Sequence, residues 1–186
     1  ILLTYSISKE EYGSWVIIID ILGIIFLLVQ FGIPDVIGRD VPRKDGDARG
    51  LVRFYSNYQI IAAILICPIA MIISTNIQTP GIGSGTILIL VIAITAQILG
   101  MTYRMVLRSL GEARIESWLK ILDRIIVILG YSVNYFFLES GIEGFALATA
   151  IGPSLTLVIA FHKARLSLGP LDDEEKTETS QKSQKK

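Results

Sequence analysis

The chain has very few of the side chains that build metal sites and covalent cross-links. It has one cysteine, Cys67, which excludes a disulfide within the chain, and one histidine, His162, interpreted as an interfacial cation at a helix end. It also lacks a nucleotide-binding glycine loop and a nucleophile–base constellation, so we expect no cofactor, no metal and no enzymatic activity. The formal net charge is zero, so the positions of the charges are more informative than their sum.

Apolar residues, in contrast, are abundant and grouped in blocks. They make up 52% of the chain, a composition that would give a soluble domain a surface it could not keep in water. Each block has close to the ~20 residues that a helix needs to cross ~30 Å of hydrocarbon. The blocks run through 15–34, 54–73, 86–103, 121–138 and 142–161. The sequence therefore predicts an all-α, polytopic membrane protein with five transmembrane helices in a bundle spanning residues 1–165.

The connectors between these blocks differ in charge. Basic residues occupy the connector 35–53, the segment 104–124 and the stretch that follows the last block. The connector 74–85 has no charge, and the turn 139–141 is acidic. Five spans force the sides of the membrane to alternate, so all the basic connectors lie on one side. By the positive-inside rule that side is the cytoplasm, which predicts a multi-pass protein of the cell membrane.

Both ends of the chain differ from the bundle. The apolar start at 1–7 is interpreted as the end of a helix whose beginning is missing, and the chain as a fragment. Residues 166–186 lose aromatic and branched aliphatic side chains and are rich in Asp, Glu, Lys, Ser, Thr and Gln. Such a segment buries too little apolar surface to offset its ordering entropy, so we expect a disordered cytoplasmic tail.

Polar residues inside the spans follow single faces. At ~100° per residue, each set falls within roughly one sector of its helix. The sets are Gly13, Asp20, Gly23, Gln30 and Pro34 in the first span; Gln97, Gly100, Arg104 and Arg108 in the third; and Asp123, Gly130 and Asn134 in the fourth. Three spans that each have one polar face predict a shared hydrated cavity. The last span carries Gly144, Ala148 and Gly152 at a spacing that favours close helix packing.

Structural explanations compete with a cavity role at each polar position. Arg104 and Arg108 lie near a helix end and could snorkel to lipid phosphates. Gln30, Gln97 and Asn134 fit interhelical hydrogen bonds, and Asp123 fits a solvated pair with the adjacent Arg124. Asp20 is harder to explain structurally, because an unpaired carboxylate inside a span costs ~2.5–3.5 kcal/mol. For Asp20 the alternatives to a cavity role are a retained proton or a structural pair.

Several motifs occur in an order that resembles the polysaccharide, or lipid-linked oligosaccharide, flippases. These belong to a superfamily that also includes multidrug exporters and the peptidoglycan-precursor flippase. The motifs are Glu11-Tyr12-Gly13; Phe31-Gly32-Ile33-Pro34 followed by Val36-Ile37-Gly38-Arg39; the connector 107–113; and Gly141-Ile142-Glu143-Gly144-Phe145-Ala146-Leu147-Ala148-Thr149-Ala150. The resemblance covers residues 8–165. It implies a two-lobed transporter whose central cavity opens alternately to either side, with this chain supplying the second to sixth helices of the first lobe.

The resemblance also implies a function and roles for residues. The substrate would be a lipid-diphosphate-linked glycan, and the other partners would be membrane lipids and a second transporter half, with no nucleic acid. Arginine suits the diphosphate because its planar fork binds phosphate oxygens in pairs. Arg39 is the first choice for substrate binding, followed by Arg104 and Arg108, with Gln97 and Asn134 contributing. The ion-coupling residues would be Asp20 and Asp123.

Three other functions remain open. A cation-coupled drug exporter shares the superfamily architecture, but it favours acidic and aromatic cavities over arginines. An inactive, truncated membrane module is a second alternative. The third is an enzyme, because Asp45-Gly46-Asp47-Ala48-Arg49 resembles the metal-binding signature of phosphatidyltransferases. That signature needs one more residue before Ala-Arg and two further aspartates in the next helix, whereas the span 54–73 has no acid.

Overall fold

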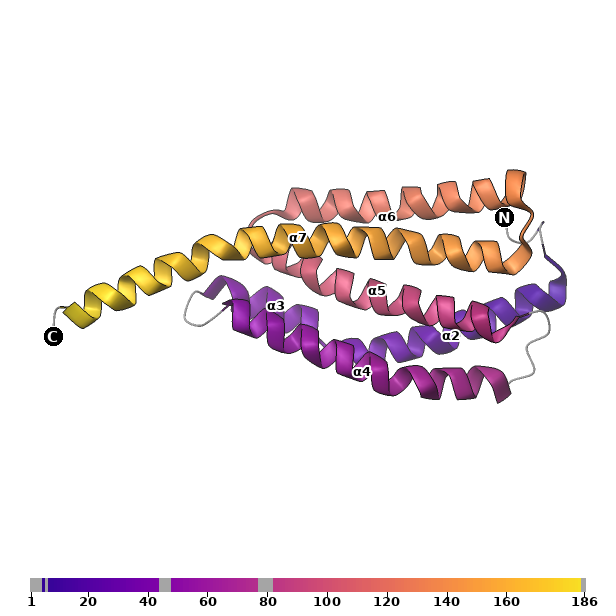
Figure 1. The fold of residues 1–186 in the computed structure, drawn as a ribbon, viewed down its shortest axis with the longest axis horizontal. Coiled ribbons are helices and arrows are strands. Elements are labelled where there is room, and N and C mark those ends of the chain that lie inside the picture. Colours follow the sequence, from indigo (N-terminus) through magenta and orange to yellow (C-terminus); the bar gives the residue numbers. More distant parts are fainter. Residues whose placement is uncertain (1–4, 6, 44–47, 77–81, 185–186) are drawn as a thin grey trace.

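The computed structural model is a bundle of long helices that run roughly along one axis (Figure 1). It describes residues 5, 7–43, 48–76 and 82–184, without the side chains of 66, 67, 70, 73–76 and 170–184. The elements are α2 (Lys9–Gln30), α3 (Ile33–Asp40), the 3₁₀ turn η1 (Val41–Arg43), α4 (Ala48–Asn76), α5 (Ser84–Ser109), α6 (Ala113–Val133), the π-helical turn η2 (Asn134–Leu138) and α7 (Gly141–Gln184). Within the described residues the predicted all-α class is confirmed.

Four helical segments among the described residues are long and apolar enough to cross a membrane. They are Lys9–Arg43, Ser84–Ser109, Ala113–Leu138 and Gly141–Gly169. The predicted count of five is not matched. The remaining predicted span, 54–73, lies in the 29-residue helix α4, where the side chains of 66, 67, 70 and 73 fall outside the described set. Four such helices are compatible with a multi-pass membrane protein.

Helix α2 ends at Gln30, four residues before the predicted end of the first span, because the backbone turns sharply between α2 and α3. Phe31 has a φ of 28° and Gly32 a φ of 72°, and Pro34 lies in the first turn of α3. A left-handed glycine followed by a proline that cannot donate a backbone hydrogen bond stops one helix and starts the next. The short α3 then turns Ile33 and Ile37 into the bundle, where α3 packs against α5.

The C-terminal segment differs from its prediction. Residues 166–184 continue α7 as one helix that leaves the bundle, whereas the composition predicts disorder from 166 onward (Figure 1). The physical reason is local: Glu, Lys and Gln have high helix propensity, and they extend a helix that the bundle has already nucleated. Residues 185–186 lie outside the described residues. So does most of the predicted helix remnant at 1–7, where the structure describes residues 5 and 7 alone.

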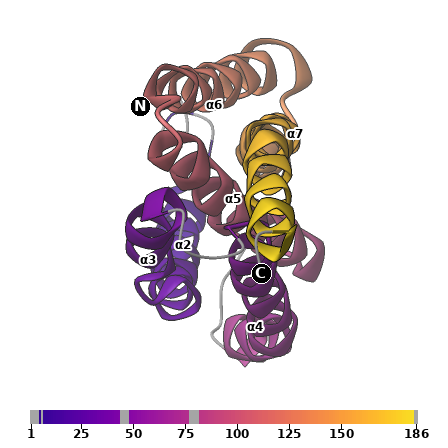
Figure 2. The ribbon, with the colours of Figure 1, turned by 90° about the vertical axis from the view of Figure 1, so that its left-hand side faces the viewer.

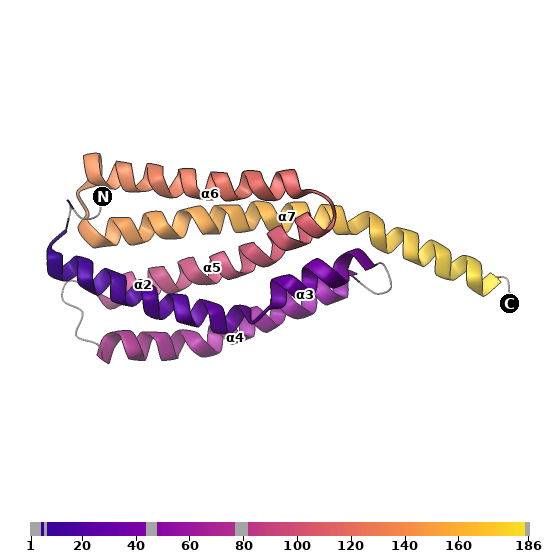
Figure 3. The same cartoon turned by 180° about the vertical axis from the view of Figure 1, so that it is seen from behind.

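Helix α5 is at the centre of the bundle. It packs along α7, and α6 packs on α7 from the other side (Figure 2). Helices α2, α3 and α4 pack on α5 away from α6, and α2 and α3 form one bent line along the bundle (Figure 3). The end of α3, the start of α4 and the turn from α5 to α6 lie at the same end, together with the second half of α7 (Figure 1). We call this the basic end, because the predicted basic connectors meet there.

Small residues hold α6 and α7 close together, as their spacing predicts. Gly144 lies against Asn134, and Gly152 lies against Asp123 and Val127. A Cβ atom added at Gly130 would come within 2.7 Å of the Ala148 Cβ atom, and one added at Gly152 within 2.8 Å of Val127 Cγ2. Without a hydrophobic drive between helices in lipid, such close van der Waals packing is what joins them.

The apolar core consists of two separate clusters. One lies at the end opposite the basic end and contains Trp15, Ile18, Leu22, Ile82, Ile87, Leu90, Val91, Ile142, Phe145 and Ala146. The other lies at the basic end and contains Ile33, Ile37, Val41, Val52, Val106, Leu107, Leu119, Ala160, Ala164 and Leu168. The stretches of α4 to α7 that run between the clusters bring polar side chains into the middle of the bundle. This division positions the candidate site.

Candidate functional site

Buried polar side chains from five helices occupy the region between the two apolar clusters. We call them the polar layer, and each is at most 8% exposed: Gln30, Gln59, Thr102, Arg104, Asp123 and Thr156. Side chains in this region of a soluble bundle are normally apolar. In a bundle that crosses a membrane, buried ionisable residues are rare and are most often functional. The polar layer is therefore the candidate site.

Neutral hydrogen bonds join the helices on one side of the layer. Thr102 Oγ1 donates to Gln59 Oε1 at 2.8 Å and so links α5 to α4. Gln30 Nε2 lies 2.8 Å from the sulfur of Met101 and links α2 to α5. Thr156 Oγ1 donates to the carbonyl of Gly152 within α7, at 3.0 Å. The Gln30 contact agrees with the expectation that this amide is an interhelical hydrogen-bond partner.

Three buried polar atoms of the layer have no hydrogen-bond partner among the described residues. They are Gln59 Nε2, Arg104 Nε and Asp123 Oδ1. Buried polar atoms in proteins almost always have partners, so an unpartnered one needs an explanation. Two of the three belong to ionised groups of opposite sign, for which burial without a partner is most unfavourable. The layer therefore contains both a donor and an acceptor that can bind a small polar species or a proton.

Arg104 and Asp123 come from different helices and are electrostatically coupled. Arg104 on α5 is 8% exposed and lies within electrostatic reach of Asp123 and Glu116 on α6. Glu116 is also buried and forms an ion pair with Lys120 one turn further along α6. Charges of both signs thus lie near one another here, which reduces the free energy of placing these groups between membrane helices.

A glycine makes room for Asp123. A Cβ atom added at Gly152 on α7 would come 3.0 Å from Asp123 Oδ1. Beside Arg104 the packing is looser, since a Cβ atom added at Gly100 on α5 would lie at ordinary van der Waals distance, 3.8 Å from Arg104 Nη1 and 3.7 Å from the backbone of Leu157. The close approach of α6 and α7 and the burial of Asp123 therefore depend on Gly152.

Of the seven residues that the sequence proposes as a site, two lie in the polar layer, Arg104 and Asp123. Asp20 is exposed on α2, ~200° around the helix from the buried Ile18. Arg39 is exposed on α3 and pairs with its neighbour Asp40, with Nε and Oδ1 2.7 Å apart. Arg108 is exposed at the end of α5, and Gln97 is half-buried in the middle of α5. Sequence periodicity placed these polar residues on one face of each span, but it could not show which neighbouring helix that face meets.

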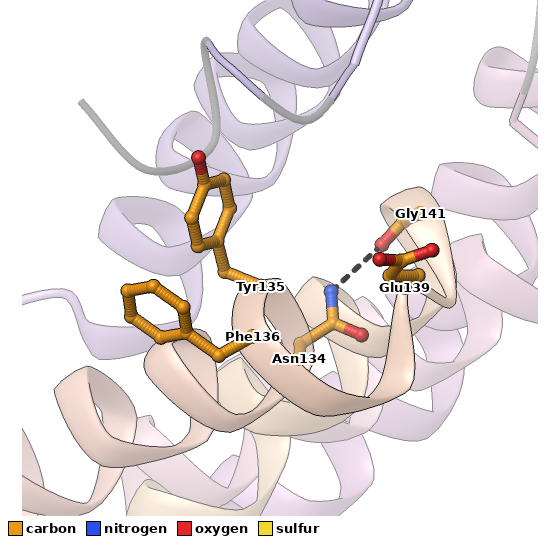
Figure 4. A pocket seen from close by; sticks show the side chains of 5 residues that line it. All are labelled: Asn134, Tyr135, Phe136, Glu139 and Gly141. Carbon is orange, nitrogen blue, oxygen red and sulfur yellow. Dashed lines mark hydrogen bonds between the residues drawn. The ribbon is translucent and has the colours of Figure 1, made fainter.

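Asn134 has a structural role at the opposite end of the bundle. Its Nδ2 donates to the carbonyl oxygen of Gly141 at 3.1 Å, and its Oδ1 accepts from the backbone N–H of Ser140 at 3.3 Å (Figure 4). These bonds close the turn between η2 and α7. A pocket of about 540 Å³ lies here, and its other lining side chains are Tyr135, Phe136 and Glu139. In Figure 4 both aromatic rings point away from the Asn134 amide, so Asn134 stabilises the turn and does not contribute to the polar layer.

Sequence reasoning missed Gln59, Thr102 and Thr156. Each is a polar residue in or beside a predicted span, which was the available signal. What the sequence could not show is that Gln59 and Thr102, 43 positions apart, bond to each other. No family model, no curated protein and no solved structure matches this chain.

Proposed function

We propose that this chain is a transport module of a membrane flippase that moves lipid-linked oligosaccharide or polysaccharide precursors across the cell membrane by alternating access. The polar layer is the observation that carries the proposal. The order of motifs that resembles the flippases adds the substrate class: a lipid diphosphate carrying a glycan. A second transporter half would complete the substrate path.

The energetics of the membrane favour a functional explanation of the polar layer. Placing an arginine or an aspartate at the centre of a membrane helix costs ~2.5–3.5 kcal/mol. The cost is smaller for Arg104, which lies near the C-terminal end of α5, than for Asp123, which lies further inside α6. Leucine in either position would avoid that free energy and would pack equally well between helices. Arg104 and Asp123 are therefore expected to respond to something that reaches the middle of the bundle. Substrate phosphate and a coupling proton or cation are the two species that a flippase brings there.

The distribution of charge supports an orientation. Arginines and lysines gather at the basic end, whereas the described residues near the other end include Glu10, Glu11, Glu139 and Glu143, with Lys9 among them. We infer from the positive-inside rule that the basic end faces the cytoplasm. In this orientation the C-terminal part of α7 projects into the cytoplasm, and a lipid-linked substrate made there meets the arginine-rich end first.

The test is transport of a fluorescent lipid-linked sugar in proteoliposomes that contain the chain together with any second half it requires. We expect Arg104→Gln and Asp123→Asn each to lower the flipping rate at least tenfold. Arg114→Gln is the control, since it removes the same charge from an exposed position on α6. Wild-type flipping by both layer variants would refute the role of the polar layer. The absence of flipping by the wild-type assembly would instead favour an inactive membrane module.

A cation-coupled drug exporter is the second candidate. The buried carboxylates Asp123 and Glu116 are what favours it, because a cationic substrate needs acidic partners. The adjacent Arg104 and the Lys120 ion pair neutralise both carboxylates, which favours an anionic substrate instead. Binding of a polyprenyl diphosphate measured against an organic cation separates the two functions.

A further inference from the structure

A cleft of about 480 Å³ opens at the basic end, between α4, α5 and α7. Three arginines line it: Arg49 and Arg53 from α4, and Arg165 from α7. Its inner surface is apolar and aromatic. There Tyr103 of α5 and Phe161 of α7 meet edge to face, with ring centres 5.2 Å apart. The described residues that line the cleft include no carboxylate, so its electrostatic preference is for an anion.

A buried hydroxyl adds a hydrogen-bonding group to this cleft. Ser56 lines it, is 3% exposed, and has no hydrogen-bond partner for its Oγ atom among the described residues. Ser56 is one turn along α4 from Arg53, on the side toward the middle of the bundle. A hydroxyl donor beyond a ring of guanidinium groups is a common arrangement for binding phosphate oxygens, since both kinds of group donate hydrogen bonds.

An apolar groove of about 520 Å³ continues from the cleft along the same three helices. Ile60 lines both the cleft and the groove, and the groove extends past Ala63 to Pro68 on α4. Its rims are open to the surroundings, because Ile64 is 65% exposed and Ile92 is 52% exposed. At ~1.5 Å per residue, the distance from Arg53 to Pro68 is ~22 Å, more than the ~15 Å of hydrocarbon in one leaflet.

We propose that the cleft and the groove together bind one lipid with a phosphate headgroup. The phosphate contacts Arg53, Arg165 and Ser56 at the basic end, and the hydrocarbon chains lie in the groove between α4 and α5. An anion with a long apolar chain matches both the charge and the shape of the site, whereas a soluble anion leaves the groove uncovered. The proposal deepens the proposed function, because this is where a substrate lipid would first bind before it is moved, and it rests on the membrane placement inferred above.

The experiment measures lipid retained by the purified chain in native mass spectrometry. The probes are phosphatidylglycerol and a polyprenyl diphosphate, each against zwitterionic phosphatidylcholine. We expect both anionic lipids to be retained in preference to phosphatidylcholine. The double variant Arg53→Gln/Arg165→Gln should lower their retention by about tenfold per arginine, because hydrogen bonds to charged groups are of that strength. Ala63→Trp, which fills the groove with an indole, should lower retention of all three lipids.

Controls separate this site from general attraction to a basic surface. Arg43→Gln/Arg114→Gln removes two arginines from the same end of the bundle outside the cleft, and we expect it to retain the anionic lipids as the wild type does. Ser56→Ala removes a hydroxyl that has no hydrogen-bond partner in the described part of the chain, so folding should be unchanged while anionic lipid retention falls. Circular dichroism melting checks that each variant is folded. Equal losses in the cleft and control variants would overturn the proposal.

Two further outcomes distinguish the occupant from other anions and from transport itself. Displacement of phosphatidylglycerol by equimolar glycerol 3-phosphate would show that the hydrocarbon chains of the lipid contribute nothing to binding. That result also overturns the proposal. Retention is measured without flipping, so a chain that retains anionic lipid at this site but does not transport would refute the proposed function and leave the lipid site standing. Preferred retention of the polyprenyl diphosphate over phosphatidylglycerol would support both.

Discussion

The contact between α6 and α7 gives a sharp test of the fold through Gly144→Ala. Position 144 lies where the start of α7 meets the Asn134 side chain. A Cβ atom there would overlap with the Asn134 side-chain oxygen and lie 2.8 Å from Nδ2. The amide cannot simply rotate away, because its two ends bond the Gly141 carbonyl and the Ser140 N–H. One added methyl group must therefore separate the helices or break the turn.

The expected size follows from opposing contributions. Alanine in place of glycine favours a helix by at most ~1 kcal/mol. Overpacking a tight contact costs ~1–3 kcal/mol, and the loss of the two Asn134 hydrogen bonds adds ~2 kcal/mol at about 1 kcal/mol each. The sum is a loss of about 2–4 kcal/mol in the free energy of unfolding.

Reversible unfolding in mixed micelles, followed by circular dichroism, measures this difference. Gly23→Ala is the matched control, because nothing lies within 4 Å of a Cβ atom added at that position in α2. The control should be as stable as the wild type or more stable, by up to ~1 kcal/mol. If Gly144→Ala matched Gly23→Ala in stability, the close packing of α6 on α7 would be wrong.

Three other predictions follow from the same contacts. Asn134→Ala should lower the free energy of unfolding by ~1–3 kcal/mol, since it leaves the Ser140 N–H and the Gly141 carbonyl without their partner. Denaturant titration measures this difference, and an unchanged free energy of unfolding would contradict the role of Asn134 in the turn. In a background without the native cysteine, a membrane-impermeant maleimide should label Ser140→Cys and Arg114→Cys from opposite sides of a sealed vesicle, and labelling from one side would refute the orientation of α6. A double-mutant cycle of Arg104→Gln and Asp123→Asn should show a coupling energy of ~0.5–3 kcal/mol in unfolding titrations, and additive effects would show that the two groups act independently.

Much of the helical architecture was predictable, because it depends on local sequence. The lengths of the apolar blocks indicated where helices run, and the spacing of Gly144, Ala148 and Gly152 indicated close packing. The end of α2 was misjudged by four residues. A left-handed turn at Phe31 and Gly32 is a matter of backbone geometry, and apolar composition does not reveal it. The helical extension of α7 was missed because composition was weighed and the propensity of its residues was not.

The candidate site was much less predictable. Periodicity places polar residues on one face of a helix, but the helix can rotate about its axis, and only contacts with its neighbours fix that rotation. Asp20 and Asp123 are both aspartates inside predicted spans, yet one is exposed on α2 and the other is buried against α7. The cleft of Arg49, Arg53 and Arg165 joins residues more than 100 positions apart, so no motif could reveal it.

The sequence by itself determined that this chain forms long apolar helices and that its basic residues gather on one side. The hydropathy of a span depends on neighbouring residues, and the basic connectors recur after every second crossing, so both features can be read along the chain. Only the tertiary structure decided which polar groups meet. Thr102 bonds to Gln59 because α4 packs on α5, and Asp123 is buried beside Gly152 because small residues allow α6 and α7 to approach closely. Pairing between helices is a property of their packing, and packing depends on side-chain shape at positions far apart in the chain.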